Sequence, residues 1–286
     1  MSDRNTKASI TYRRMIARDL TAAHALSQAV RWAHRRADWE VMLALGMGFV
    51  AEEDGVLAGT ALCWKYGAEH AALGMIIVAP DLQGRGIGRA LMDLVLEELG
   101  PRSIQLTATP AGQPLYEKLG FVSRGSVVHH QGTLRPVPPA PLAAGERIRP
   151  AVPGDLPALA SLAAGALGLP RDEVLAHLLE VGAGVLLEKE GQPLGFSMIR
   201  PFGLGHMIGP VVAPDAARAQ ALIGHWTTSH AGGIVRVDVS GDSELGPWVE
   251  SLGLALAGPS VRMLRGAPPV PDGRLRQYAI LNQAMG

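Results

Sequence analysis

Three glycines alternate with other residues in the stretch Gln83-Gly84-Arg85-Gly86-Ile87-Gly88, directly before a helical pattern. Glycine adopts positive φ and carries no Cβ, so successive backbone amides here can point into one concavity. The helix that follows adds unpaired N–H groups and the positive end of its dipole. Together these features predict a site for a phosphate or pyrophosphate, with Arg85 and Arg89 supplying positive charge at its rim.

Two other phosphate motifs and a purely structural turn are alternatives for this loop. The dinucleotide fingerprint needs G-x-G-x-x-G and a ribose-binding acid after the next strand, but Ile104–Ala108 leads only to Thr109 and Pro110. The nucleotide P-loop needs a Lys and a hydroxyl residue that this stretch lacks. A tight turn that merely packs a helix on a strand would need one glycine. The observed spacing therefore favours a phosphate site of another kind.

The elements that must position this loop predict a mixed α/β fold, with a central mixed β-sheet flanked by helices. Asp54-Gly55 is a strong hairpin signal between two strands, and Asp19 is placed to cap the first helix. The apolar run 71–80 predicts a strand covered on both faces. Helices are expected over 20–33, 38–45, 88–99 and 112–120, and further strands over 103–108 and 125–134.

The second half of the chain repeats landmarks of the first at a nearly constant offset of 133 to 136 residues. The pairs are Asp19 and Asp155, Pro80 and Pro214, and Gly120 and Gly253. Between the halves, residues 135–145 carry four prolines and little that could form a regular element. We therefore predict a duplicated domain, with a first copy over 1–134, a Pro-rich linker over 135–145 and a second copy over 146–286.

Composition limits the function classes. The 286 residues are 48% hydrophobic and 18% charged with a formal net charge of +0, which is typical of a globular chain without a broad nucleic-acid surface. No apolar run reaches the ~18 residues of a membrane span, and the N-terminus lacks the apolar core of a signal peptide. A cytoplasmic protein without a membrane partner is expected. Cys63 is the only cysteine, and no Cys/His spacing resembles a zinc site, so no metal is expected.

Two motifs carry a family resemblance over about residues 10 to 132. The stretch "IIVAPDLQGRGIGRALM" resembles motif A of the GNAT superfamily of acetyl-CoA-dependent N-acetyltransferases, whose signature is Q/R-x-x-G-x-G/A. Gln83, Gly86 and Gly88 occupy its fixed positions. The stretch "TPAGQPLYEKLGF" resembles motif B, which usually reads N-x-x-A-x-x-x-Y-x-x-x-G-F. The second motif departs at Thr109 and Gly112, although a threonine hydroxyl can still bond a pantetheine amide or cap the next helix.

The resemblance implies acetyl-CoA as the cosubstrate and direct acetyl transfer to an amine. It implies that motif A amides hold the pyrophosphate, that the preceding strand pairs with the pantetheine, and that one strand amide stabilises the oxyanion. It also implies that Tyr116 is the general acid, since a phenol is protonated at neutral pH. The residues so implied to bind acetyl-CoA are Ile76, Ile77, Val78, Gln83, Gly84, Arg85, Gly86, Ile87, Gly88, Arg89, Thr109 and Tyr116.

The general base and the acceptor site are less defined. Residues 71–74 offer no ionisable group, which leaves water or one of four candidates: Glu69, His70, His129 and His130. The acceptor site is expected beside the first helices, at Trp32, His34, Asp38 and Trp39, where tryptophans near charged groups could enclose a small amine. The alternative is that the tryptophans pack two helices together and that the charges face water.

The second copy has lost the signature residues. The offset places Arg218, Gln220 and Leu222 where the first copy has its glycines, and Val249 where it has Tyr116. We therefore predict tandem GNAT-like domains of which the second is degenerate and has no CoA site. The predicted function is an N-acetyltransferase for a primary amine of a small molecule. A protein or peptide N-acetyltransferase and a non-catalytic acyl-CoA-binding sensor are the alternatives.

Overall fold

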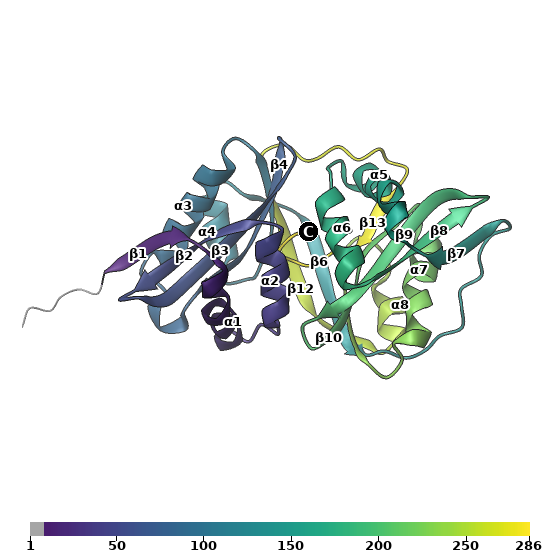
Figure 1. The fold of residues 1–286 in the computed structure, drawn as a ribbon, viewed down its shortest axis with the longest axis horizontal. Helices are drawn as coiled ribbons and strands as arrows, with labels where there is room; N and C mark the ends of the chain where they lie inside the picture. Colours follow the sequence, from purple (N-terminus) through teal and green to yellow (C-terminus); the bar gives the residue numbers. More distant parts are fainter. Residues whose placement is uncertain (1–8) are drawn as a thin grey trace, which may run out of the picture. The chain divides into compact units, whose positions relative to one another are not determined.

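The computed structural model describes residues 9–286 (Figure 1). The predicted lack of a signal peptide concerns a segment that lies largely outside these residues. The chain divides into two compact units: the first contains the residues up to Trp64 and Leu73–Pro101, and the second contains Lys65–Ala72 and Arg102–Gly286. Within the described residues, no helix is long and apolar enough to cross a membrane.

The first unit carries an antiparallel sheet in which β1 pairs with β2 and β2 with β3. The β2–β3 hairpin turns at Asp54 and Gly55, whose φ values of 51° and 81° confirm the predicted turn. The elements are β1 (Ile10–Arg14), α1 (Leu20–Ala29), α2 (Arg36–Ala44), β2 (Met47–Glu53), β3 (Val56–Tyr66), β4 (His70–Val78) and α3 (Ile87–Leu99). The end of β3 and the start of β4 belong to the second unit.

Helices cover both faces of β3. A Cβ on Gly59 would lie 3.1 Å from the Cδ1 atom of Leu91, so the missing side chain lets α3 approach this strand closely. Five residues further along, the Nε1 atom of Trp64 donates to the carbonyl of Met42 in α2 at 2.9 Å. Because side chains alternate along a strand, α3 and α2 lie on opposite faces. This packing fixes where α3 begins, and so positions the glycine loop.

The second unit contains a mixed sheet in which β4 and β5, and β10 and β11, are parallel and the other pairs antiparallel. Residues 135–145, the predicted linker, contain no helix or strand. The elements are β5 (Ser103–Ala108), α4 (Gln113–Lys118), β6 (Val122–Thr133), β7 (Glu146–Pro150), α5 (Leu156–Leu167), α6 (Asp172–Val181), β8 (Ala183–Lys189), β9 (Gln192–Phe202), β10 (Gly205–Ala213), α7 (Ala216–Ser229), β11 (Ile234–Ser240), α8 (Gly246–Ser251), β12 (Leu254–Arg265) and β13 (Arg276–Ala279).

The two halves of the chain exchange strands β6 and β12 within this unit. Strand β12, from the second half, pairs antiparallel with β5 and β6 of the first half. Strand β6 in turn pairs with β11 of the second half, with His130 opposite Val237. The order is therefore β5-β12-β6-β11, and each half completes the sheet of the other. The compact units consequently do not coincide with the sequence repeat, and the boundaries at 134 and 146 stay a prediction.

The same ion-pair cluster occurs in both halves at a constant offset of 136 residues: Arg13, Asp19 and Glu52 in the first, and Arg149, Asp155 and Glu188 in the second. In each cluster the arginine donates to both oxygens of its aspartate, at 2.7 and 2.8 Å. The clusters join the first strand of each half to the second strand and to the start of the first helix. This repeated geometry confirms the predicted duplication.

Asp19 does not cap α1 in the predicted way. It occupies the position before the helix, but its carboxylate accepts from the backbone N–H of Ile16 at 2.8 Å and from Arg13, and makes no bond to the helix amides. The prediction of a side-chain cap on α1 is therefore wrong. The carboxylate instead holds the single turn that precedes the helix.

We expect the replacement Asp155→Asn to lower the free energy of unfolding by about 1–3 kcal/mol at neutral pH, because it weakens a charge-assisted pair. Arg149 lowers the pKa of Asp155 to about 2. A folded-state pKa below the unfolded value gives stability that is present above about pH 4 and is lost as the pH falls towards 2. The melting temperature of Asp155→Asn should therefore depend less on pH between 4 and 2 than that of the wild type.

Asp19→Asn should behave alike, since Arg13 lowers the pKa of this carboxyl in the same way. The control is Glu40→Gln, which removes an exposed pair with Arg36 and should change stability by less than about 0.5 kcal/mol. Equal melting temperatures for Asp155→Asn and Glu40→Gln would contradict the structural role of the cluster.

Candidate functional site

The loop before α3 is held open at two glycines. Gly84 and Gly86 have φ values of 78° and 83°, in the left-handed region that favours glycine. A Cβ placed on either residue would meet no atom within 4 Å. The glycines therefore leave free space beside the backbone, as the sequence predicted. Gly88 lies inside the first turn of α3.

The amides around this space have no protein acceptors. Those of Ile87, Gly88 and Arg89 are the first three of α3 and lack an intrahelical partner. Within residues 9–286, none of the amides from Gly84 to Arg89 forms a hydrogen bond to a protein acceptor. Free donors at the positive end of a helix dipole suit a phosphate group. The predicted pyrophosphate therefore fits the residues that are present.

The charged side chains of the loop already have partners. Arg85 pairs with Glu53 at 2.6 Å, and Arg89 pairs with Asp93 at 2.9 Å. Exposed ion pairs of this kind contribute about 0–1 kcal/mol to stability. Either arginine could therefore exchange its carboxylate partner for a bound anion with little loss of free energy. The Nε2 atom of Gln83 donates to the carbonyl of Val78 at 3.2 Å, which ties the loop to the end of β4.

Strand β4 has an irregular backbone before the loop. Met75 is buried and has a φ of 53°, a conformation that costs about 1–2 kcal/mol for a residue other than glycine. The Oγ1 atom of Thr60 donates to its carbonyl at 2.7 Å and holds it in place. Such irregularities redirect strands and are frequent next to active sites. The pairing of β4 with β5 ends at Ala72, before the predicted pantetheine-binding residues 76–78.

Tyr116 lies on α4 in the second unit and is buried against Phe121, with the ring centroids 6.2 Å apart. Burial raises the pKa of its phenol to about 12. Its hydroxyl has no hydrogen-bond partner in the part of the chain that the structure describes. A Cβ on Gly112 would lie only 3.0 Å from the tyrosine ring, which gives a packing reason for glycine where motif B usually has alanine. Thr109 holds the turn before α4, since its carbonyl and hydroxyl both accept from the amide of Gly112.

The predicted acceptor residues divide into two pairs in the first unit. Trp39 is fully buried, and its indole N–H donates to the hydroxyl of Ser27 in α1 at 3.2 Å. Asp38 is buried as well and accepts from the backbone N–H of Arg35 at 2.8 Å, where α2 begins. These contacts hold α1 and α2 together. Trp32 and His34 are half-buried with ring centroids 5.8 Å apart, and a substrate role for any of the four stays a prediction.

The four candidate bases lie in the second unit. His129 and His130 lie on the exchanged strand β6, and the Nε2 atom of His130 is 3.7 Å from a Glu250 carboxylate oxygen. Burial, together with the nearby charge of Arg236, lowers the pKa of His129, so its ring is neutral at physiological pH. Glu69 and His70 lie at the start of β4, where its pairing with β5 begins. Within residues 9–286 no group of three or more His, Cys, Asp or Glu residues could hold a metal ion.

The corresponding stretch of the second half has no open loop. Helix α7 begins at Ala216, so Arg218, Gln220 and Leu222 lie inside it. The Oδ1 atom of Asp215 accepts from the amide of Arg218 at 2.9 Å, which places a carboxylate at the helix start. Val249, which replaces Tyr116, is fully buried core. That the second copy has no CoA site stays a prediction.

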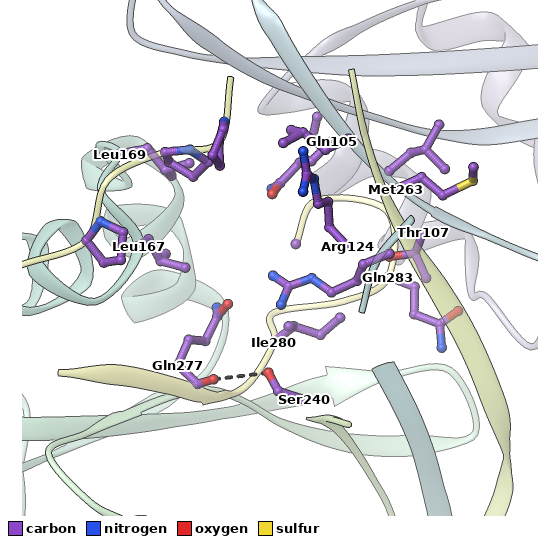
Figure 2. Close-up of a pocket in the computed structure, with 18 of the residues that line it drawn as sticks. Gln105, Thr107, Arg124, Leu167, Leu169, Ser240, Met263, Gln277, Ile280 and Gln283 are labelled. Atoms are coloured by element: carbon purple, nitrogen blue, oxygen red, sulfur yellow. Dashed lines mark hydrogen bonds between the residues drawn. The ribbon is translucent and has the colours of Figure 1, made fainter. Parts of the chain in front are cut away.

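A cavity of about 390 Å³ lies within the second unit and has the size of a small-molecule site (Figure 2). Both halves of the chain line it: Gln105 and Arg124 come from β5 and β6, and Arg262 and Gln277 from β12 and β13. Sequence reasoning missed these residues, because no motif contains them. The strand exchange brings them together.

Comparisons with known proteins agree with this organisation. The model of the acetyltransferase (GNAT) family matches residues 14–121, and an acetyltransferase (GNAT) domain model matches residues 159–279. An uncharacterized N-acetyltransferase of Bacillus subtilis, YitH, is 25% identical over 222 residues, which cover 75% of this chain and 76% of that relative.

Solved structures share the fold along nearly the whole chain. A putative acetyltransferase from Pyrococcus horikoshii has a TM-score of 0.79 at 20% identity and covers 100% of this chain and 99% of its own. A tandem GNAT protein from the clavulanic acid biosynthesis pathway has a TM-score of 0.64 at 16% identity, covering 92% and 99%. With both motifs, the duplicated cluster and two matching family models, the chain belongs to the GNAT acetyltransferases and contains two GNAT domains in tandem.

Proposed function

We propose that this protein transfers an acetyl group from acetyl-CoA to the primary amine of a small molecule, directly and within a ternary complex. The observation that carries the proposal is the loop Gly84–Arg89, with its free amides and open space at the start of α3. The family uses acetyl-CoA as its cosubstrate. The cavity in the second unit supports a small acceptor, since a peptide would need a long open groove.

The residues proposed to hold acetyl-CoA contribute both backbone groups and side chains. The amides of Gly84–Arg89 bind the pyrophosphate, with Arg85 and Arg89 moving from their carboxylate partners to the phosphate oxygens. Gln83 fixes the loop, the edge of Ile76–Val78 pairs with the pantetheine, and Thr109 bonds a pantetheine amide. When bound, acetyl-CoA supplies an acetyl group activated as a thioester.

Tyr116 is proposed as the general acid that donates its phenol proton to the leaving sulfur. Its raised pKa keeps that proton in place at neutral pH, and its hydroxyl is not committed to a protein acceptor among the described residues. An amide of Ile76–Val78 stabilises the negative charge on the carbonyl oxygen. The amine loses its proton to water or to one of the candidate bases named above, and the second copy binds no CoA.

We expect the replacement Gly86→Ala to weaken acetyl-CoA binding at least about tenfold, because a Cβ enters the anion space and strains a φ of 83°. Gly100→Ala is the matched control, since Gly100 also has positive φ and open space but lies at the other end of α3. Calorimetric titration with acetyl-CoA measures both. Equal acetyl-CoA affinities for Gly86→Ala and Gly100→Ala would contradict the proposed binding of the pyrophosphate at this loop.

We expect Tyr116→Phe to lower kcat by about a hundredfold or more with unchanged acetyl-CoA affinity, because the sulfur loses its proton donor. Tyr12→Phe, at an exposed tyrosine of β1, should leave kcat unchanged. Since the pKa of Tyr116 is about 12, ionisation of this phenol should not reduce the wild-type rate below about pH 10. Thiol release from acetyl-CoA over a panel of amines is the measurement. Acetyl-CoA binding without turnover on any amine, and without an effect of Tyr116→Phe, would indicate a sensor.

A further inference from the structure

The cavity of the second unit carries uncompensated positive charge. Arg276 pairs with Asp242 at 2.5 Å. Arg124 and Arg262 also line the cavity, and within residues 9–286 neither guanidinium group has a hydrogen-bond or ion-pair partner. An arginine stays protonated at any physiological pH. The cavity therefore presents two cationic groups, each with free N–H donors.

Arg262 is the more informative of the two, because it is half-buried on a central strand. Burial lowers its pKa, and the charge of Arg171 acts in the same direction, while Asp242 opposes both. A cation that is removed from water without a bonded anion is unfavourable. An anionic group bound in the cavity would satisfy this guanidinium.

Gln277 supplies an independent sign of a ligand. It is only 7% exposed, and its Oε1 atom has no hydrogen-bond donor among the described residues. Figure 2 shows its side chain extending from β13 into the cavity, while its backbone carbonyl accepts from Ser240 at 3.1 Å. Buried acceptors without a partner are rare in native proteins. A ligand with an ammonium or hydroxyl group would donate the hydrogen bond that the Oε1 atom of Gln277 lacks.

The remaining lining mixes apolar side chains with the polar side chains of Gln105, Thr107, Ser240 and Gln283. Leu167 and Leu169 form one wall in Figure 2, and Met263 and Ile280 lie on other sides. Strand β5 contributes Gln105 to the lining and leads directly into the turn and helix that carry Tyr116. The cavity thus combines cationic donors, a free buried acceptor and some apolar surface, and β5, which precedes the turn and helix of Tyr116, forms part of its lining.

We propose that this cavity binds the acceptor and selects one that carries an anionic group, a carboxylate or a phosphate, besides its amine. The anion contacts Arg262 and Arg124, a donor group of the acceptor bonds the Oε1 atom of Gln277, and the apolar wall holds the intervening carbon skeleton. This inference rests on the proposed function, which it narrows to anionic amines as substrates.

The first arm of the test is turnover of matched amines: serine against serinamide, phenylalanine against phenylalaninamide, and phosphoethanolamine against ethanolamine. The charged member of at least one pair should have a kcat/KM about tenfold higher or more. Arg262→Gln should abolish most of this preference through a higher KM, and Arg262→Lys should retain part of it. Arg265→Gln, at an exposed arginine of the same strand, is the control and should match the wild type.

A preference for the neutral members, or equal KM values for Arg262→Gln and Arg265→Gln, would overturn the inference while leaving the proposed function intact. A preference for serine or phenylalanine over its amide would identify the selected anion as a carboxylate, and a preference for phosphoethanolamine over ethanolamine would identify it as a phosphate.

The second arm measures binding without turnover, so that the two proposals can fail separately. Inorganic phosphate or succinate, compared with sodium chloride at equal ionic strength, should raise the melting temperature of the wild type and of Arg265→Gln by a few degrees more than that of Arg262→Gln, which keeps the glycine loop but loses the cavity arginine. If no amine is acetylated and this shift is seen, the anion site stands and the proposed function fails. If neither anion shifts the wild type, the anion site is refuted.

Discussion

The exchange of β6 and β12 is the constraint on which the second unit depends. Each of these strands has backbone hydrogen bonds on both edges only because the other half of the chain supplies a neighbour. Buried backbone groups must be paired, so neither half could keep this sheet intact without the other. Such interdependence gives the copy without the signature residues a structural role in the shared sheet.

The two halves share the interactions that hold the fold together but differ at the start of the helix that follows their fourth strand. The Arg-Asp cluster that joins strands to the first helix is the same in both, to within the precision of its distances. The start of the helix after the fourth strand differs, since one half has an open glycine loop and the other a direct helix start at Asp215. The two halves thus share the scaffold interactions and differ in the backbone at this helix start.

Much of the fold and part of the candidate site could be predicted from sequence. Local signals sufficed for the hairpin at Asp54-Gly55 and for the positive φ of Gly84 and Gly86, because each depends on conformations that few residues adopt. The cap at Asp19 was mispredicted, since the competing arginine comes from a neighbouring strand. The cavity could not be predicted at all. Arg262 lies beside β5 because β12 pairs with that strand, and Gln277 lies on β13, which pairs with β10. Pairing between such distant segments leaves no periodic pattern in the sequence.

The carboxylate of Asp215 is an anion that is covalently part of the chain and lies at the start of α7. A tethered anion has an effective concentration far above that of any diffusing metabolite, so the helix start at Arg218 is occupied at all times. The loop of the first copy has no such side chain, and its amides from Gly84 to Arg89 have no protein acceptor within residues 9–286. In the second copy the amide of Arg218 is thus satisfied by a side chain of the same chain, and this helix start needs no diffusing anion.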